Sequence, residues 1–353
     1  MQDKFGKTAL SKTQWLADLH WTAQSPLMVS LDQYAPSQTD FNNCRQLYSA
    51  DGRIGLQGDS ELYSQCLATL TSRFLGPYFE CLWSSLVCLS GHLRLIAHGL
   101  QIHEAGKTLG EFDFLLQLYQ SSPANTITLL PEIIHQEVAV KFYLGVSGTD
   151  HLGCTSPAWI GPNQIDRLDL KLFDMLTRQI RLSQQTGIKA KLAEMLCPEI
   201  CSNSVIKPEI VIKGYLFHPY GQKLPLPSYV NPSVAAGQWL SYSELIGSEL
   251  TEADTHNQQW IVLPKLCWLA PAVASEHDLM NNQQLITTLR KKMATGKPQL
   301  LARMRAKVNH ENPHSPMAEI ARYFIVGDHW LAHAKQSVFA RPLKDITQAM
   351  AHT

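Results

Sequence analysis

Two successive stretches of the chain alternate between apolar and polar residues, and this pattern limits the possible folds more than any other feature. In IIHQEVAVKFYLGV, residues 133–146, one face is aliphatic and aromatic, and the other carries His135, Glu137 and Lys141. In GEFDFLLQLY, residues 110–119, Glu111 and Asp113 share the polar face. Both stretches are therefore predicted to be β-strands with one packed face and one polar face.

The segments around these strands predict an α/β domain. Residues 61–89 contain two helical stripes separated by Gly76-Pro77, residues 93–103 are rich in aliphatic residues, and residues 164–185 have the apolar spacing of a long helix. A further strand is expected at residues 209–218. The order of helix, three strands, helix and strand indicates an α/β layered core with a mixed sheet.

The 353 residues are enough for two domains, or for one domain with large additions. We expect an N-terminal helical extension over residues 1–60, the core over 61–218 and a C-terminal α+β region over 219–353. In that last region we expect a strand at 260–268 and helices around 278–308 and 315–323.

Composition indicates a soluble globular protein. The 30 basic and 30 acidic side chains cancel, so no global field attracts the chain to nucleic acid or to an anionic membrane. The N-terminus lacks an apolar signal core, and no apolar stretch is long enough to span a bilayer. We therefore expect a cytoplasmic protein with no membrane partner.

The cysteines are scattered and contain no Cys-x-x-Cys pair, which favours buried free thiols and a reducing compartment. A structural metal at Cys197 and Cys201 is the weaker alternative, because no second pair of ligands lies at zinc-site spacing. The eight cysteines are Cys44, Cys66, Cys81, Cys88, Cys154, Cys197, Cys201 and Cys267.

The polar faces of the two alternating strands are the strongest candidate for a functional site. They place Asp113 and Glu111 beside Glu137, His135 and Lys141 on one side of the sheet. Clustered charges on a sheet are costly unless they are solvated, paired or bound to a cation. Mg²⁺, or Mn²⁺ in its place, suits carboxylate ligands, and a nearby lysine can orient the water that attacks a phosphodiester.

These motifs resemble those of the PD-(D/E)XK, or restriction-endonuclease-like, nuclease superfamily. Gly110-x-x-Asp113, followed by a strand with Glu137-x-Ala139-x-Lys141, is similar to its paired motif, and the element order over residues 61–218 is similar to its core. The resemblance implies that Asp113 and Glu137 bind Mg²⁺ and that Lys141 assists the nucleophilic water.

The resemblance also implies supporting residues and has one departure. Glu80 lies where many members carry an additional acidic ligand, and Gln179 is placed like a glutamine of some branches. Ala139 occupies the position where an acid usually precedes the lysine by two residues. Glu137 lies four residues before Lys141, about 13 Å along an ideal strand. A bulge, or Glu111 as a substitute carboxylate, would complete the metal site.

The whole chain also resembles a family of uncharacterised bacterial proteins, a domain of unknown function. The stretches that carry this resemblance are GPYFECLW, TLGEFDFLL, HQEVAVKFYL and WIGPNQIDRLDLKL. This family implies no substrate.

Two functions follow, and whether the chain is an enzyme stays open. The first is a Mg²⁺-dependent nuclease or phosphodiesterase acting on DNA or RNA; the second is a catalytically inactive nuclease fold that binds nucleic acid or protein. A locally basic segment is a candidate phosphate-binding surface, with a solvated helical face as the alternative. Its residues are Arg290, Lys291, Lys292, Lys297, Arg303, Arg305 and Lys307.

Overall fold

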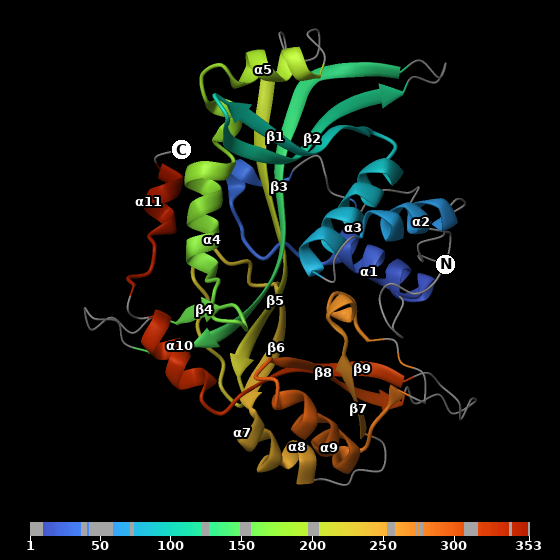
Figure 1. The fold of residues 1–353 in the computed structure, drawn as a ribbon, viewed down its shortest axis with the longest axis vertical. Helices are drawn as coiled ribbons and strands as arrows, with labels where there is room; N and C mark the ends of the chain where they lie inside the picture. Colours follow the sequence, from blue (N-terminus) through green and yellow to red (C-terminus); the bar gives the residue numbers. More distant parts are fainter. Residues whose placement is uncertain are drawn as a thin grey trace. The chain divides into compact units, whose positions relative to one another are not determined.

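The computed structural model gives a mixed α/β architecture (Figure 1). It describes residues 10–36, 41, 59–70, 74–121, 127–148, 157–196, 205–252, 258–272, 274, 278–306, 317–338 and 341–351. The α/β class and the mixed sheet agree with the prediction from the sequence.

The chain divides into two compact units, and each is assembled from separate segments. The first unit comprises Met1–Trp21, Lys141–Leu170 and Gly214–Lys344, and the second comprises Thr22–Val140, Lys171–Lys213 and Asp345–Thr353. The three contiguous ranges expected as domains divide the chain in a different way, and they stay a prediction.

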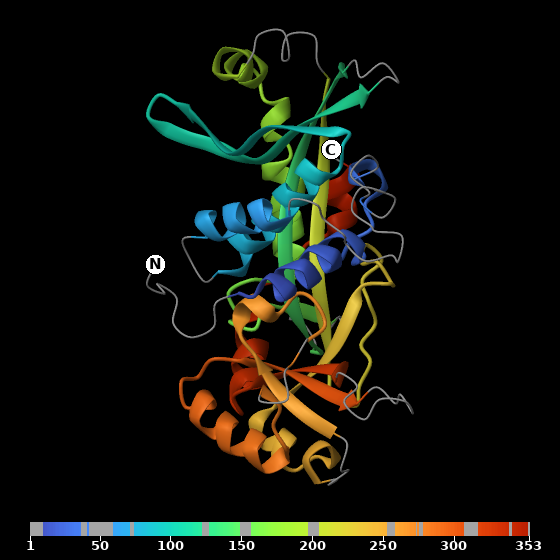
Figure 2. The same cartoon turned by 90° about the vertical axis from the view of Figure 1, so that its right-hand side faces the viewer.

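The second unit contains the four strands expected for the core. β1, β2 and β3 are antiparallel neighbours, and β5 follows β3 in the strand order. Figure 2 shows β1 and β2 as a long, bent hairpin. The bounds are β1 Leu93–Glu104, β2 Lys107–Ser121, β3 Ile127–Val146 and β5 Val205–Pro219, of which β3 and β5 also give residues to the first unit.

Short helices accompany these strands. α3 buries an apolar stripe that includes Tyr78, Phe79, Leu82 and Trp83, and it packs against β1 and α2 (Figure 1). The bounds are α2 Asp59–Thr69, α3 Leu75–Leu89, α4 Leu168–Asp174, η4 Met175–Gln179, η5 Leu182–Gln184, α5 Ile188–Met195 and α11 Ile346–Ala351. α1 spans Lys12–Gln24 and η1 spans Asp32–Tyr34. The helix expected over residues 164–185 is therefore divided into α4, the π-helix η4 and the 3₁₀-helix η5.

The first unit continues the mixed sheet in the order β3-β5-β6-β9-β8-β7, and β4 pairs with β3. β5, β6 and β9 are parallel, whereas β7, β8 and β9 are antiparallel. The bounds are β4 Ala158–Ile160, β6 Ala235–Ser241, β7 Gln258–Leu263, β8 Gln299–Ala306 and β9 Met317–Val326. Its other elements are α7 Tyr242–Ile246, α8 Glu249–Glu252, η6 Lys265–Cys267, α9 Asn282–Met293 and α10 Trp330–Val338.

Of the two helices expected in the C-terminal region, the first is confirmed over part of its length and the second is wrong. Only the part over α9 is helical; β8 and β9 are strands where helices were predicted around 278–308 and 315–323. α9 buries Leu285 and Leu289 against Trp260 of β7 and Leu301 of β8. Leu300 and Leu301 are neighbours in β8 and both are buried. The alternation of apolar and polar residues that marks a strand is therefore interrupted and hard to recognise in the sequence.

Gly214 allows β5 to approach β3 closely within the first unit. Its φ is +137°, and a Cβ built on it would lie 1.8 Å from the carbonyl oxygen of Lys141. Both the backbone angle and the lack of space require glycine here.

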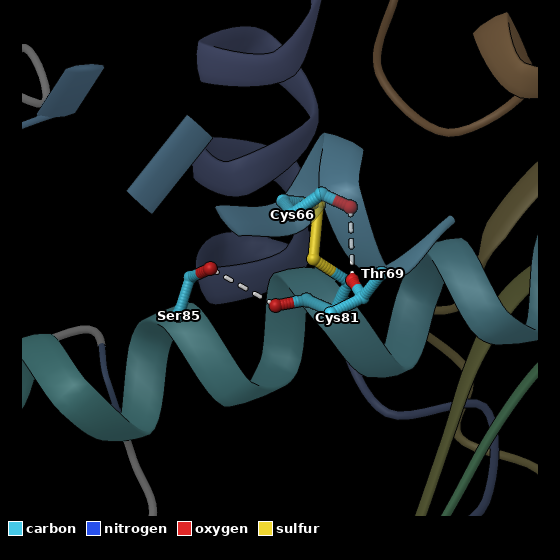
Figure 3. Close-up of a disulfide and its surroundings, with 4 residues drawn as sticks. All are labelled: Cys66, Thr69, Cys81 and Ser85. Carbon is cyan, nitrogen blue, oxygen red and sulfur yellow. Dashed lines mark hydrogen bonds between the residues drawn. A yellow bond between two sulfur atoms is a disulfide. The ribbon is translucent and has the colours of Figure 1, made fainter. Parts of the chain in front are cut away.

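A disulfide joins Cys66 of α2 to Cys81 of α3, so the expectation of free thiols is wrong for these two residues (Figure 3). The Thr69 hydroxyl donates to the carbonyl of Cys66 and the Ser85 hydroxyl to that of Cys81. Cys88 is free and exposed, and Cys267 is free and half-buried. The other four cysteines, including the pair Cys197 and Cys201, lie outside the described residues.

Within the described residues, no helix is both long enough and apolar enough to cross a membrane.

Candidate functional site

Asp113 and Glu137 meet where β2 and β3 separate. The ladder pairs Leu115 with His135 and Phe114 with Gln136, which makes Asp113 and Glu137 the next opposed residues. Beyond this point, side-chain carboxyl groups accept hydrogen bonds from backbone amides of the neighbouring strand. Asp113 Oδ2 accepts a 3.0 Å hydrogen bond from the Val138 amide, and the Glu137 carboxyl accepts one from the Asp113 amide. The end of the β2–β3 pairing therefore brings the two predicted carboxyl groups together.

Burial makes ionisation of this carboxyl pair unfavourable. Glu137 is fully buried and Asp113 is half-buried. Desolvation raises the pKa of Asp113 to about 7, and the charge of Glu137 adds to this effect. Desolvation likewise raises the pKa of Glu137 to about 7, against the opposing charge of Lys171 and a hydrogen bond with Asp113. The pair therefore holds on to protons that exposed carboxylates release near pH 4.

His135 fixes one oxygen of Glu137 from the same strand. Its Nε2 lies 3.0 Å from Glu137 Oε1 and its Nδ1 lies 3.1 Å from the Ser183 hydroxyl, and all three side chains are buried. Burial lowers the pKa of His135 to about 4, so the ring is neutral at pH 7. The Ser183 hydroxyl in turn donates to the carbonyl of Ile180 over 3.3 Å. His135 therefore contacts one of the two predicted carboxyl groups.

Gln179 and Lys171 complete the surroundings of Glu137. Gln179 Nε2 donates to Glu137 Oε2 over 2.9 Å, and its Oε1 accepts from Lys171 Nζ over 2.9 Å. The positive charge of Lys171 lowers the pKa of both carboxyl groups. The π-helix η4 follows α4 directly and carries Gln179 at its end. π-Helical turns are frequent at functional sites.

Lys171 is the site residue that the sequence prediction missed. It lies between Leu170 and Leu172 in the largely apolar helical stretch LDLKLFDML. A lysine directly before the buried Leu172 is the signal that could have identified it. Its ammonium belongs to the same unit as Asp113 and Glu137.

Lys141, predicted to assist the water, forms an ion pair instead. Its Nζ lies 2.6 Å from Asp166 Oδ2, which also accepts the hydroxyl of Tyr143 over 3.2 Å. These three residues belong to the first unit.

The other two predicted acids have partners of their own. Glu111 accepts from Gln101 over 2.9 Å on the exposed surface, although its charge still raises the pKa of Glu137. Glu80 pairs with His98 at 3.4 Å. It lies on α3, whose Trp83 donates to Gln136 on the opposite face of β3 from Glu137. Glu80 therefore acts on Asp113 through its charge alone.

The described residues contain no group of three or more His, Cys, Asp or Glu side chains that could hold a metal ion. Asp113 and Glu137 are a pair of neighbouring carboxyl groups, and the side chains of Lys171, Gln179 and His135 lie around Glu137. The chemistry of the pair suits a hard divalent cation that keeps several waters, as Mg²⁺ does.

The basic segment is divided between two elements. Arg290, Lys291 and Lys292 form the last turn of α9, and Lys297 lies in the exposed loop that follows. Arg303 and Arg305 lie on β8, and Lys307 falls outside the described residues. The basic segment is therefore not one helical face, and its binding to phosphate groups stays a prediction.

A comparison with family models gives a match over residues 17–326 of the chain. The matching description is "Domain of unknown function (DUF1853)". The chain belongs to this family. No match was found among curated proteins or among solved structures.

Proposed function

We propose that this DUF1853 protein is a divalent-cation-dependent nuclease or phosphodiesterase whose cation ligands are Asp113 and Glu137. The proposal is carried by one observation: the half-buried Asp113 and the buried Glu137 are hydrogen-bonded neighbours at the end of the β2–β3 pairing, where their pKa values are raised to about 7 and the charge of Lys171 acts on both. A divalent cation between them would offset the buried negative charge and displace their protons.

The residues around the pair have separate roles in this proposal. His135 and Gln179 each hold one oxygen of Glu137, which fixes its orientation toward Asp113. Lys171, held by Gln179, takes the role that the sequence assigned to Lys141, and its charge favours a negatively charged phosphoryl group nearby. Bound Mg²⁺ would polarise a phosphoryl oxygen and lower the pKa of a coordinated water.

A nuclease fold that binds without cleaving is the second candidate. It is favoured by Ala139 at the position of the usual acid and by the ion pair of Lys141 with Asp166. In this case the exposed Arg290, Lys291 and Lys292 would contact phosphate groups. We place either activity in the cytoplasm, where Cys66 and Cys81 would be reduced thiols.

Calorimetric titration of Mn²⁺ and Mg²⁺ tests the cation site. We expect binding to the unmodified chain, loss of binding in Asp113→Asn, and retention in Asp174→Asn, a nearby acid on α4 that pairs with the exposed Arg178. Cleavage of single- and double-stranded DNA and RNA is then measured with each cation. Binding without cleavage of any substrate would favour the second candidate, and equal binding by all three proteins would contradict the site.

A further inference from the structure

A pocket of about 390 Å³ lies in the second unit, between the segment after η5 and the beginning of β5. Ser183, Gln184, Gln185, Thr186 and Lys189 supply its polar lining. Its volume falls in the range of small-molecule sites.

Among the described residues that line the pocket, the polar side chains carry hydroxyl, amide and ammonium groups and no carboxylate. Such a surface offers hydrogen-bond donors and one positive charge, so it favours a ligand with several acceptor oxygens and a negative charge. A phosphate ester has both properties.

The pocket also has an apolar part. Val205 and Ile206 line it, and Val205 is 67% exposed, which is unusual for a large aliphatic side chain. A flat ring or a sugar next to the phosphate would cover this surface. Phosphate and ring together describe one nucleotide unit.

The pocket is connected to the carboxyl pair through hydrogen bonds. Ser183 lines the pocket, and only 3% of it is exposed. Its hydroxyl lies 3.1 Å from His135 Nδ1. His135 Nε2 in turn lies 3.0 Å from Glu137 Oε1. A ligand that moves Ser183 therefore changes the hydrogen bonds that orient Glu137.

We propose that this pocket holds one nucleotide unit of the substrate, with the phosphate at Lys189 and Thr186, and that Ser183 and His135 transmit its occupancy to Glu137. This rests on the proposed nuclease function, which it extends by naming the substrate class and a second binding position. His135 is a positioning residue in this scheme, because it acts through Glu137.

In the test, deoxyadenosine 5′-monophosphate is titrated into the full chain, and its binding is monitored by the NMR chemical shifts of the backbone amides. We expect shifts at residues 183–189 with a dissociation constant on the order of 1 mM. Lys189→Gln should weaken binding about fivefold. The matched control is Lys191→Gln, because Lys191 pairs with Glu104 at 2.7 Å and does not line the pocket. Unshifted amides at residues 183–189 would overturn the proposal.

The connection to Glu137 is tested on the imidazole nitrogens of His135. We expect the probe to shift them in the unmodified chain and to leave them unchanged in Ser183→Ala, while Thr186 and Lys189 still respond. If the probe does not shift the imidazole nitrogens of His135 in the unmodified chain, the proposed connection between the pocket and Glu137 is contradicted. Mn²⁺ titration of the same samples separates the two proposals. Mn²⁺ binding without a nucleotide response contradicts the pocket alone; a nucleotide response without Mn²⁺ binding contradicts the nuclease and leaves a nucleotide site.

Discussion

Lys171 and Lys141 differ in what surrounds each ammonium group. Lys171 contacts Gln179, the residue that holds Glu137, whereas Lys141 is paired with Asp166. A lysine stabilises a phosphoryl transition state only when its charge lies close to the reacting group. In the proposed nuclease, the residue geometry therefore favours Lys171 over Lys141 as the lysine next to the reacting phosphoryl group.

Replacement of each lysine by methionine separates these assignments. We expect Lys171→Met to lower the cleavage rate about 100-fold or more, because a charge next to the developing phosphoryl charge is lost. Lys141→Met should retain most activity and lose a partly exposed ion pair. Cleavage assays at saturating Mn²⁺ measure both, and the reverse order of effects would contradict the assignment.

Gly214 gives a second prediction at the residue scale. In Gly214→Ala, a Cβ would overlap the Lys141 carbonyl at a φ of +137°, so we expect a loss of about 3 kcal/mol or more, or a failure to fold. Gly221→Ala is the matched control. Its φ is +71° with nothing within 4 Å, so only about 1 kcal/mol should be lost. Denaturant unfolding compares the two, and equal losses would contradict the close approach.

At the scale of elements, the polar alternation of the sequence predicted which two carboxyl groups lie together in the candidate site. Asp113 and Glu137 were predictable because adjacent alternating strands place opposed residues on one face. The contact of Lys171 with Gln179 was not predictable, because Lys171 lies in α4 and Gln179 lies at the end of the π-helical segment that divides the expected helix. The strand β8 was missed because burial of both Leu300 and Leu301 hides its alternation, and the basic residues around it indicated a solvated helix.

The disulfide between α2 and α3 could not be predicted from the sequence either. Cys66 and Cys81 are fifteen residues apart, in two helices whose relative placement depends on tertiary packing. Scattered cysteines give no information about such a pair.

Loss of this disulfide should destabilise the oxidised protein. Closing a loop of fifteen residues is worth about 3 kcal/mol through the entropy of the unfolded chain. We expect Cys66→Ser with Cys81→Ser to lose about this amount, and a reductant to produce the same loss in the unmodified chain. Alkylation and mass spectrometry on rapidly quenched cells would report the state in vivo. Oxidised cysteines there would contradict the cytoplasmic placement.

For the whole molecule, the carboxyl pair predicts an unusual dependence of stability on pH. Asp113 and Glu137 titrate near pH 4 in the unfolded chain and near pH 7 in the folded one. Because their folded pKa values are raised, their stabilising effect is complete below about pH 4 and is lost as the pH rises to about 7. His135 acts in the opposite direction: its folded pKa is lowered to about 4, so its contribution is present above about pH 6.5 and is lost as the pH falls toward 4.

These opposing effects can be separated by substitution. The double variant Asp113→Asn with Glu137→Gln removes the carboxyl contribution and keeps that of His135, so its free energy of unfolding should rise with pH between about 4 and 7 relative to the unmodified chain. Mn²⁺ should stabilise the unmodified chain most above pH 7, where the cation no longer competes with protons, and should not affect the variant. Denaturant unfolding across this pH range measures both effects. Parallel curves for the two proteins would mean that neither carboxyl group holds a proton in the folded state, which would remove the main argument for a cation site.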